Sequence, residues 1–551
     1  MAPTKAPARY RPAAVTGKLV DLFAGRVYPA RLELASGRIA RIEPASEAEH
    51  YLIPGFVDAH VHIESSMLVP SEFARLAVRH GTVATVSDPH EIANVLGVAG
   101  VRYMLEQAEG LPFKVAFGAP PCVPATSFET AGATLDALAV GELLGDPRVK
   151  YLSEVMNYPG VVAGEVALLA KLSAARALGK PVDGHAPGVR GETLRRYAAA
   201  GIGSDHECST RLEAEEKLAL GLKVLIREGS AAKNFAALHP LLREHADRMM
   251  FCSDDLHPDD LLEGHIDKLV RRGLAAGHDL MTLLRVASRN PVEHYGLDVG
   301  LLREGDPADF LVVKDLAGLE VLETYVGGQR VAQRGESLMP RRPARIVNRF
   351  EARPQAAAAF AVEARPGRLR VIEARDGQLV TGERLMNPSL SGGLAVADPA
   401  RDLLKLAVVN RYEQAPPAVA FVHGFGLRRG ALASSVAHDS HNVVAVGVTD
   451  EAISRAVNLV IAARGGLSFV AEEEEGLLPL PVAGLMSDGE AESVARHYAR
   501  LDEAARGLGS SLRAPYMTLS FMALLVIPAL KLSDEGLFDG EKFAFTDLFV
   551  L

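Results

Sequence analysis

The segment YLIPGFVDAHVH, residues 51–62, is an apolar run that ends in two histidines separated by one residue. Successive side chains of a strand point to opposite faces, so His60 and His62 lie on the same face. Two imidazoles at a strand end can bind one divalent cation, but many such pairs are ordinary polar residues. The ends of the other predicted strands decide between these two interpretations.

Seven further short apolar runs follow this segment, and helix-length amphipathic segments separate them. The runs are GTVATVSDP, FKVAFGAP, VKYLSEV, KPVDGH, AGIGSDH, LKVLIREGS and RMMFCSDD. Alternating strands and helices are typical of βαβ units on a parallel sheet. Eight such repeats predict an α/β fold, a (β/α)8 TIM-like barrel over residues 51–295. A doubly wound open sheet is the alternative, but no glycine-rich phosphate loop follows the first strand.

Two further domains are predicted beside the barrel. Strand-like segments precede residue 50, and DFLVV (309–313) reads as another strand, so residues 1–50 and 296–345 should form one discontinuous, small flanking β-sandwich domain. A segment rich in proline and arginine, residues 339–354, is typical of a linker. Residues 346–551 should form a C-terminal α/β domain.

Composition and charge exclude several classes of protein. The formal net charge of -10 argues against a nucleic-acid-binding protein, which needs clustered Lys and Arg. The most apolar stretch, residues 516–530, is shorter than the ~20 residues of a membrane-spanning helix and contains Pro528, so no membrane partner is expected. Three scattered cysteines and a start without a continuous apolar segment predict a cytoplasmic protein.

Four more predicted strands end in residues that bind metals: Glu154, His185, His206 and Asp254. The carboxyl ends of barrel strands meet at one mouth, so these residues should lie near the histidine pair. A chance origin would require five strands to end independently in such residues. One tetrahedral ion needs only three or four ligands. The six therefore predict two divalent cations with Glu154 as a shared ligand.

This arrangement predicts metal-assisted hydrolysis. Two nearby cations lower the pKa of a shared water, which makes hydroxide available at neutral pH. Asp254 could bind one metal and also carry the proton from that water to a leaving group. A hydrolytic zinc site of the P-C-x-x-C type is excluded, because PPCVPAT (120–126) lacks a second cysteine.

Several of these motifs resemble known families. The segments PGFVDAHVH, GHAPG (184–188), SDHE (204–207), CSDD (252–255) and NPVEHYGLDVGLLREGDPADFLVV resemble the amidohydrolase superfamily. More narrowly, DAHVHIESSM, DPHEIANVLG, SEVMN and SSVAHDSHN resemble the bacterial adenine deaminases, over nearly the whole chain.

The resemblance implies conversion of adenine to hypoxanthine and ammonia in purine salvage. It implies two divalent metal ions, Mn2+ first with Fe2+ or Zn2+ as alternatives, and a homodimer. Many amidohydrolases bridge their metals with a carbamylated lysine on the fourth strand. This chain has Glu154 there, as adenine deaminases do, and Lys150 lies at the wrong end of the run.

Further residues near the strand ends are candidates for catalysis or substrate binding. Glu64 could exchange a proton with the purine ring or support a metal ligand. His90 could assist proton transfer, or SDPHE could be a simple loop cap. His441, between two strand-like runs, could close the pocket over the barrel or lie in a solvent-facing hairpin. We assign Glu64 and His90 to catalysis with Asp254 and Glu154, and substrate binding to Glu64, Ser65, Asp88 and His441.

Two other functions remain open. A ring hydrolase on the same metal scaffold, such as a dihydroorotase or hydantoinase, would cleave a cyclic amide, but the polar groups that would hold its substrate are not identifiable. A non-catalytic homologue would have lost metal ligands, whereas all six are present.

Overall fold

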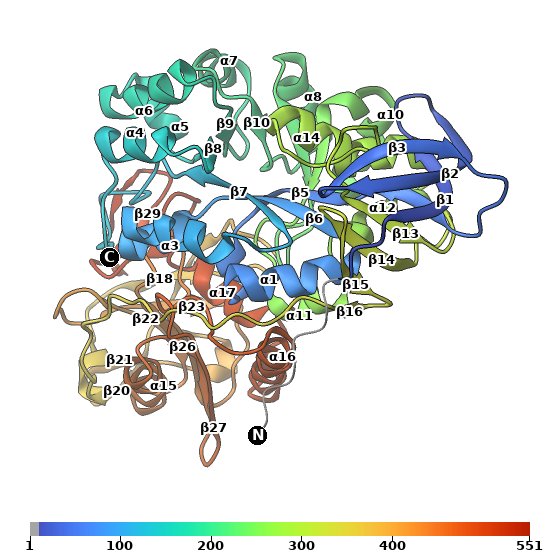
Figure 1. Cartoon of the computed structure of the whole chain (residues 1–551). Helices are drawn as coiled ribbons and strands as arrows, with labels where there is room; N and C mark the ends of the chain where they lie inside the picture. The colour runs from blue at the N-terminus through green and yellow to red at the C-terminus, as the bar shows by residue number, and fades with distance from the viewer. Residues whose placement is uncertain (1–9) are drawn as a thin grey trace.

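The barrel predicted for the middle of the chain is present in the computed structural model, which describes residues 10–551 (Figure 1). Strands β5 to β9 form one parallel sheet and β10 to β12 a second. The eight strands are β5 (Phe56–Val61), β6 (Thr82–Ser87), β7 (Lys114–Ala119), β8 (Val149–Val155), β9 (Val182–Gly184), β10 (Ser204–Asp205), β11 (Lys223–Arg227) and β12 (Met249–Cys252). The predicted fold class is confirmed.

Helices connect these strands, as a parallel barrel requires. The longer ones are α1 (Pro70–Ala77), α3 (Val98–Ala108), α4 (Ala137–Gly145), α6 (Val166–Ala177), α7 (Gly191–Ala199), α8 (Arg211–Ala219) and α12 (Ile266–Ala275). Shorter ones are α2 (His90–Leu96), which follows β6, α11 (Pro258–Glu263), which follows β12, and α14 (Asn290–Tyr295). Inward-facing residues of the strands, such as Tyr151 and Met250, fill the barrel interior.

The barrel closes at the histidine pair. The last strand meets the first through a parallel bridge between Val61 and Asp254. The amide of Asp254 donates to the His60 carbonyl at 2.9 Å, and the amide of His62 donates to the Asp254 carbonyl at 3.3 Å. Asp254 has a φ of 58°, a left-handed conformation that turns the chain sharply beyond β12.

The opening segment forms two strands rather than the single strand predicted. β4 (Tyr51–Pro54) pairs with strands of the flanking sheet, and β5 begins the barrel after Gly55. A side chain at Gly55 would collide with Val83 of β6, so the two sheets meet only because this position has none. An uninterrupted apolar run in the sequence does not reveal that its two halves pair with strands of different sheets.

The flanking region is one eight-stranded sheet with the order β16-β15-β14-β13-β4-β1-β2-β3. Its strands are β1 (Ala14–Asp21), β2 (Arg26–Ala35), β3 (Arg38–Pro44), β4, β13 (Phe310–Val313), β14 (Val321–Val326), β15 (Gln329–Gln333) and β16 (Glu336–Ser337). The sheet encloses its own apolar cluster, which includes Leu32, Leu52 and Phe310. Figure 1 shows β1 to β3 (dark blue) beside β13 at one side of the barrel.

The C-terminal region is built on a mixed sheet with the order β19-β18-β23-β22-β25-β24-β26-β27, and β31 (Phe549–Val550) pairs with β18. The other strands are β18 (Arg368–Glu373), β19 (Gly382–Met386), β22 (Leu404–Val409), β23 (Ala418–His423), β24 (Ala431–Ser434), β25 (Val443–Gly447), β26 (Gly466–Val470) and β27 (Glu475–Pro479). Its helices are α15 (Asp450–Ala462), α16 (Ala491–Gly507) and α17 (Pro515–Phe521). α16 packs against α11 and α1 of the barrel, so the two regions share an extensive interface.

The apolar stretch 516–530 is buried in this region, where it forms α17 and the turns that follow. None of the helices between residues 10 and 551 combines the length and apolar character needed to cross a membrane. Most of the N-terminal stretch behind the prediction of a cytoplasmic protein, and the first nine residues of the predicted flanking domain, lie outside the described residues.

Candidate metal centre

The six residues predicted as metal ligands meet at the carboxyl ends of the barrel strands. His60 and His62 come from β5 and the turn after it, and their Nε2 atoms are 3.2 Å apart. Asp254, just after β12, places its Oδ1 3.1 Å from the Nε2 of His62 and 3.5 Å from that of His60. All three side chains are buried. They form the first half of the cluster.

Glu154 at the end of β8 contacts both halves of the cluster. Its Oε2 lies 2.9 Å from the Nδ1 of His185 and 3.1 Å from the Nε2 of His206. The same oxygen is 3.8 Å from the Nε2 of His60, and Oε1 is 3.7 Å from that of His62. A single carboxylate therefore faces four imidazoles, which is the position required of a shared ligand.

The surrounding charges keep both carboxylates ionised. Burial alone would raise the pKa of Glu154, but His185 and His206 hold this pKa well below its usual range. Burial would likewise raise the pKa of Asp254, and the Arg227 guanidinium together with the two histidines of β5 holds it well below normal. Ionised carboxylates are the form that binds cations.

The donor set fits divalent metal ions. The Nε2 of His206 is buried and makes no hydrogen bond, although it lies close to the Glu154 carboxylate. The Nε2 of His185 is likewise buried without a partner. Nitrogen and oxygen ligands with imidazoles in the majority are typical of transition-metal sites rather than of calcium sites. The cluster is therefore a site for divalent metal.

Two further residues belong to the cluster and were not predicted. Glu207 places its Oε1 3.6 Å from the Nδ1 of His185 and 3.5 Å from the Nε2 of His206. Arg227, the last residue of β11, donates from Nη2 to Glu207 Oε2 at 3.0 Å and from Nη1 to Asp254 Oδ2 at 2.6 Å. Glu207 stands next to His206 in SDHE and Arg227 ends the seventh strand, so the strand-end criterion could have identified both.

A cavity opens above the cluster, and the barrel and the C-terminal region both line it. His62, His90, Glu154, His185 and Asp254 face it from the barrel. The C-terminal region contributes Leu379, His438, Asp439, Phe521, Leu524 and Val526. The pocket over the metal cluster is thus completed by residues that lie far beyond the barrel in sequence.

The four residues predicted to bind substrate, Glu64, Ser65, Asp88 and His441, are not among the residues that line this cavity, and the last three contact residues that do. Ser65 donates to Asp255 at 2.6 Å, and Asp88 accepts from the hydroxyl of Ser153 at 2.7 Å and from the amide of Glu154 at 3.3 Å. Glu64 accepts from the amide of Ile92 at 3.3 Å. Their contact with substrate stays a prediction, because the strand-end pattern does not distinguish residues that line the cavity from residues one layer behind it.

Burial raises the pKa of the Glu64 carboxyl to about 7. The side chain is 2% exposed, and its Oε2 makes no hydrogen bond. Glu64 is not among the residues that line the cavity, and it accepts from the start of α2, so its predicted catalytic role stays a prediction.

His90 does line the cavity. Its Nδ1 lies 3.2 Å from Asp88 Oδ2 and 3.5 Å from Glu154 Oε1. It is also the first residue of α2, so SDPHE both starts a helix and places an imidazole beside the cluster. SDPHE therefore begins a helix, and the role of His90 in proton transfer stays a prediction.

The loop between β24 and β25 docks onto the start of α2. His438 Nδ1 lies 2.5 Å from Glu91 Oε1, and the ring of His441 contacts the other oxygen of the same carboxylate. Asp439 Oδ1 lies 3.7 Å from the Nε2 of His90. His441 is fully buried, so the alternative of a solvent-facing hairpin is wrong.

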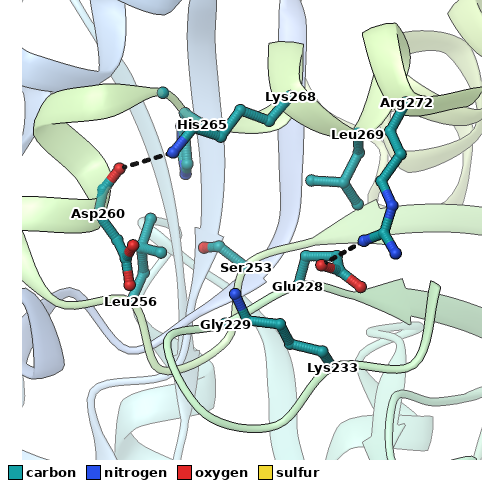
Figure 2. A pocket seen from close by; sticks show the side chains of 11 residues that line it. Glu228, Gly229, Lys233, Ser253, Leu256, Asp260, His265, Lys268, Leu269 and Arg272 are labelled. Carbon is teal, nitrogen blue, oxygen red and sulfur yellow. Dashed lines mark hydrogen bonds and ion pairs between the residues drawn. The ribbon is translucent and has the colours of Figure 1, made fainter. Parts of the chain in front are cut away.

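A second hollow lies beside β12 and α12 (Figure 2). Arg272 pairs there with Glu228 at 2.6 Å, and Lys268 donates to the backbone carbonyl of Asp260 at 3.4 Å. His265, the imidazole among its lining residues, uses its Nε2 to contact Asp58 at 2.8 Å. The hollow therefore presents no ligand cluster comparable with the one at the strand ends.

Sequence comparisons agree with this geometry. Residues 51–331 match the profile of the amidohydrolase family, and residues 378–544 match that of the adenine deaminase C-terminal domain. An adenine deaminase from Salinibacter ruber is 61% identical over 97% of this chain and 99% of its own. The chain belongs to the adenine deaminase family of amidohydrolases. The resemblance read from the motifs is confirmed.

Other relatives in this family are nearly as similar. An adenine deaminase from Sulfurovum sp. is 56% identical over 96% of this chain and 98% of its own. Among solved structures, a D-hydantoinase from Thermus sp. is 15% identical, with a TM-score of 0.47 over 60% of this chain and 97% of that one. The family's C-terminal profile contains both the docking loop and α17, which border the cavity.

Proposed function

We propose that this protein hydrolyses adenine to hypoxanthine and ammonia, a reaction of purine salvage. Relatives that align over nearly their whole length carry the name adenine deaminase. The observation that carries the proposal is that the loop of His438 to His441, inside the adenine deaminase C-terminal match, completes the cavity over the barrel's metal cluster. A barrel with a metal cluster alone would fit many hydrolases.

The proposed cofactor is a pair of divalent cations, with Mn2+ as the first candidate and Fe2+ or Zn2+ as alternatives. His60, His62 and Asp254 would hold one ion, and His185 and His206 the other, with Glu154 shared between them. Glu207, which lies near both of the latter histidines, would complete or orient the second half. When bound, the metals supply the Lewis acidity that makes hydroxide available at neutral pH.

Asp254 is the proposed proton carrier. Its Oδ1 faces the cavity side of the cluster, while Arg227 holds Oδ2. The carboxylate can accept a proton as water adds to C6 of the purine, and it can deliver that proton to the amino group, which leaves as ammonia. His90 lines the same cavity and is positioned to hydrogen-bond the ring.

The test is ammonia release from a panel of adenine, guanine, cytosine, adenosine and dihydroorotate, with protein loaded separately with manganese and iron. We expect adenine to be the preferred substrate. If adenine is inert while dihydroorotate or another ring turns over, the proposal is wrong and a cyclic-amide hydrolase replaces it. Metal-loaded protein that binds adenine but releases no ammonia would indicate a non-catalytic homologue.

We also propose that the protein is a cytoplasmic homodimer, as expected from the family resemblance. The mass of the particle in solution, measured by light scattering, tests the oligomeric state. A monomer at micromolar concentration would contradict it.

A further inference from the structure

One wall of the cavity is apolar and comes from the C-terminal region. Leu379, Phe521, Leu524 and Val526 face the metal cluster there, and we call these four residues the apolar wall. The opposite side carries imidazoles and carboxylates. A flat heteroaromatic base needs such a pairing, because its faces are apolar while its edges carry hydrogen-bonding groups.

The apolar wall is assembled from separate segments. Leu379 lies between β18 and β19, Phe521 ends α17, and the other two members lie in the turns that follow. Side chains from loops and helix ends hold a precise position only when their backbone is fixed by further contacts. One residue provides that contact for two of the segments at once.

Lys531, in β28 (Leu530–Leu532), joins these segments. Its Nζ donates to the carbonyl of Leu379 at 2.7 Å and to the carbonyl of Phe521 at 2.9 Å. Neighbouring backbone hydrogen bonds join the same segments: the amide of Leu532 donates to the carbonyl of Met522, and the amide of Thr381 donates to the carbonyl of Pro528. Removing the ammonium would leave the Phe521 carbonyl with the longer bond from the amide of Leu524 at 3.3 Å and would take the lysine donor away from the Leu379 carbonyl.

The position of this lysine is costly for the fold. Lys531 is fully buried, and across residues 10–551 no carboxylate lies within ion-pair distance of its Nζ. A methionine of similar length would fill the same space without desolvating an ammonium group. The lysine at this position is therefore explained by the two segments, at Leu379 and at Phe521, that its hydrogen bonds hold in place.

We propose that Lys531 is a positioning residue for substrate: it fixes the apolar wall so that the wall covers one face of a planar base and turns the base's reactive edge toward the metal cluster. This inference rests on the proposed function. The wall touches the ring rather than the reacting atoms, so its loss should weaken ground-state and transition-state binding together.

The test compares Lys531→Met with Lys171→Met. Lys171 is a matched control, because it is also buried and donates to two carbonyls, those of Pro121 and Leu135 at 2.7 Å each, neither of which lines the cavity. For Lys531→Met we expect KM for adenine to rise about tenfold with kcat within about threefold of the wild type. Metal content, measured by mass spectrometry, should not change. For Lys171→Met we expect an unchanged KM.

A second variant and a binding measurement keep the inference separable from the proposed function. Leu524→Ala removes part of the wall directly and should raise KM in the same way, even if Lys531→Met does not fold. A wild type that is inert toward adenine refutes the proposed function. In that case calorimetric titration with adenine compares the Kd of the wild type with that of Lys531→Met, which tests the apolar wall without turnover. An unchanged KM or Kd in Lys531→Met, or an equal change in Lys171→Met, overturns the inference.

Discussion

Glu154 and Asp254 show how single residues prepare this site. Each is a buried carboxylate whose pKa is held low by neighbouring cationic groups, imidazoles for Glu154 and mainly Arg227 for Asp254. In both cases the favourable partners outweigh the cost of burial, so the charge is available for metal binding. The strand-end pattern revealed both carboxylates, and Arg227, which balances Asp254, also ends a strand, but its pairing with Asp254 became visible only in three dimensions.

Asp254→Asn should lower kcat for adenine by about 10² to 10⁴-fold, the usual contribution of a positioned acid–base group. Glu154→Gln should lower kcat at least as much, because it removes the charge shared between both halves of the cluster. Steady-state ammonia release measures kcat, and circular dichroism checks that each variant folds. Glu192→Gln, at an exposed helix position, is the control. Turnover near wild type in either cluster variant would contradict the assigned roles.

Arg227→Met should destabilise the protein by about 3–5 kcal/mol, because it leaves two buried carboxylates, Glu207 and Asp254, without their cation. Urea denaturation monitored by circular dichroism gives the free energy of unfolding. Arg190→Met is the matched control, since Arg190 pairs with Glu216 at 2.6 Å on the exposed surface and should change stability little. Equal effects of the two substitutions would show that burial of the pair is unimportant.

At the scale of elements, the first and last barrel strands are joined chiefly by groups at the site itself. No extended ladder of hydrogen bonds pairs β5 with β12 in the described chain. Hydrogen bonds of Asp58 stabilise the isolated bridge between Val61 and Asp254. Asp58 accepts from the amide of Ser253 at 3.0 Å and contacts His265 at 2.8 Å, and it also receives the Ser253 hydroxyl. The closure of the barrel and the spacing of the ligands are therefore one and the same structural feature.

Asp58→Ala should cost about 1–3 kcal/mol of stability for each buried donor left unsatisfied and should lower the metal content of purified protein. The reason is that β5 carries the histidine pair and would no longer be fixed against β12. Unfolding curves and metal analysis measure the two effects. Asp21→Ala, which removes an exposed turn acceptor for Phe23 and Ala24, should leave metal content unchanged. A fully metallated Asp58→Ala protein would refute this role.

At the scale of the whole molecule, the C-terminal region covers the mouth of the barrel. The contact is polar at its centre, where Glu91 of α2 receives His438 and His441 from the docking loop. Figure 1 shows the C-terminal sheet (orange and red) packed against the barrel along its blue helices. Glu91 and His438, which join the two regions, also line the cavity over the metal cluster.

Removal of metal with a chelator should lower the Tm of the whole protein. Ions that bind only the folded state stabilise it by about 2.7 kcal/mol per site when free metal is 100 times Kd. Differential scanning calorimetry before and after chelation, and again after adding Mn2+, measures the shift. Glu154→Gln should show a smaller shift, and a Tm that ignores both chelator and metal would contradict a bound cofactor.

The contact of His438 with Glu91 should make stability depend on pH. Burial would lower the pKa of His438, but Glu91 and Asp255 raise it to about 9. Because the folded-state pKa exceeds the unfolded value of about 6.5, the stabilisation is complete below pH 6.5 and is lost as pH rises through 9. The Tm difference between wild type and His438→Asn should therefore shrink across this window. A constant difference would show that the charged pair contributes nothing.

Local patterns by themselves determined the barrel and its ligands. The alternation of apolar runs with amphipathic helices specified eight parallel strands, and such strands place their final residues at one mouth, so the clustering of the six predicted ligands follows from the strand ends alone. The wall of the pocket was decided only by tertiary structure. Phe521 and His438 reach the site because two regions dock, and no periodicity in the sequence records which surfaces meet. For the same reason, the residues one layer behind the cavity were indistinguishable from those that line it.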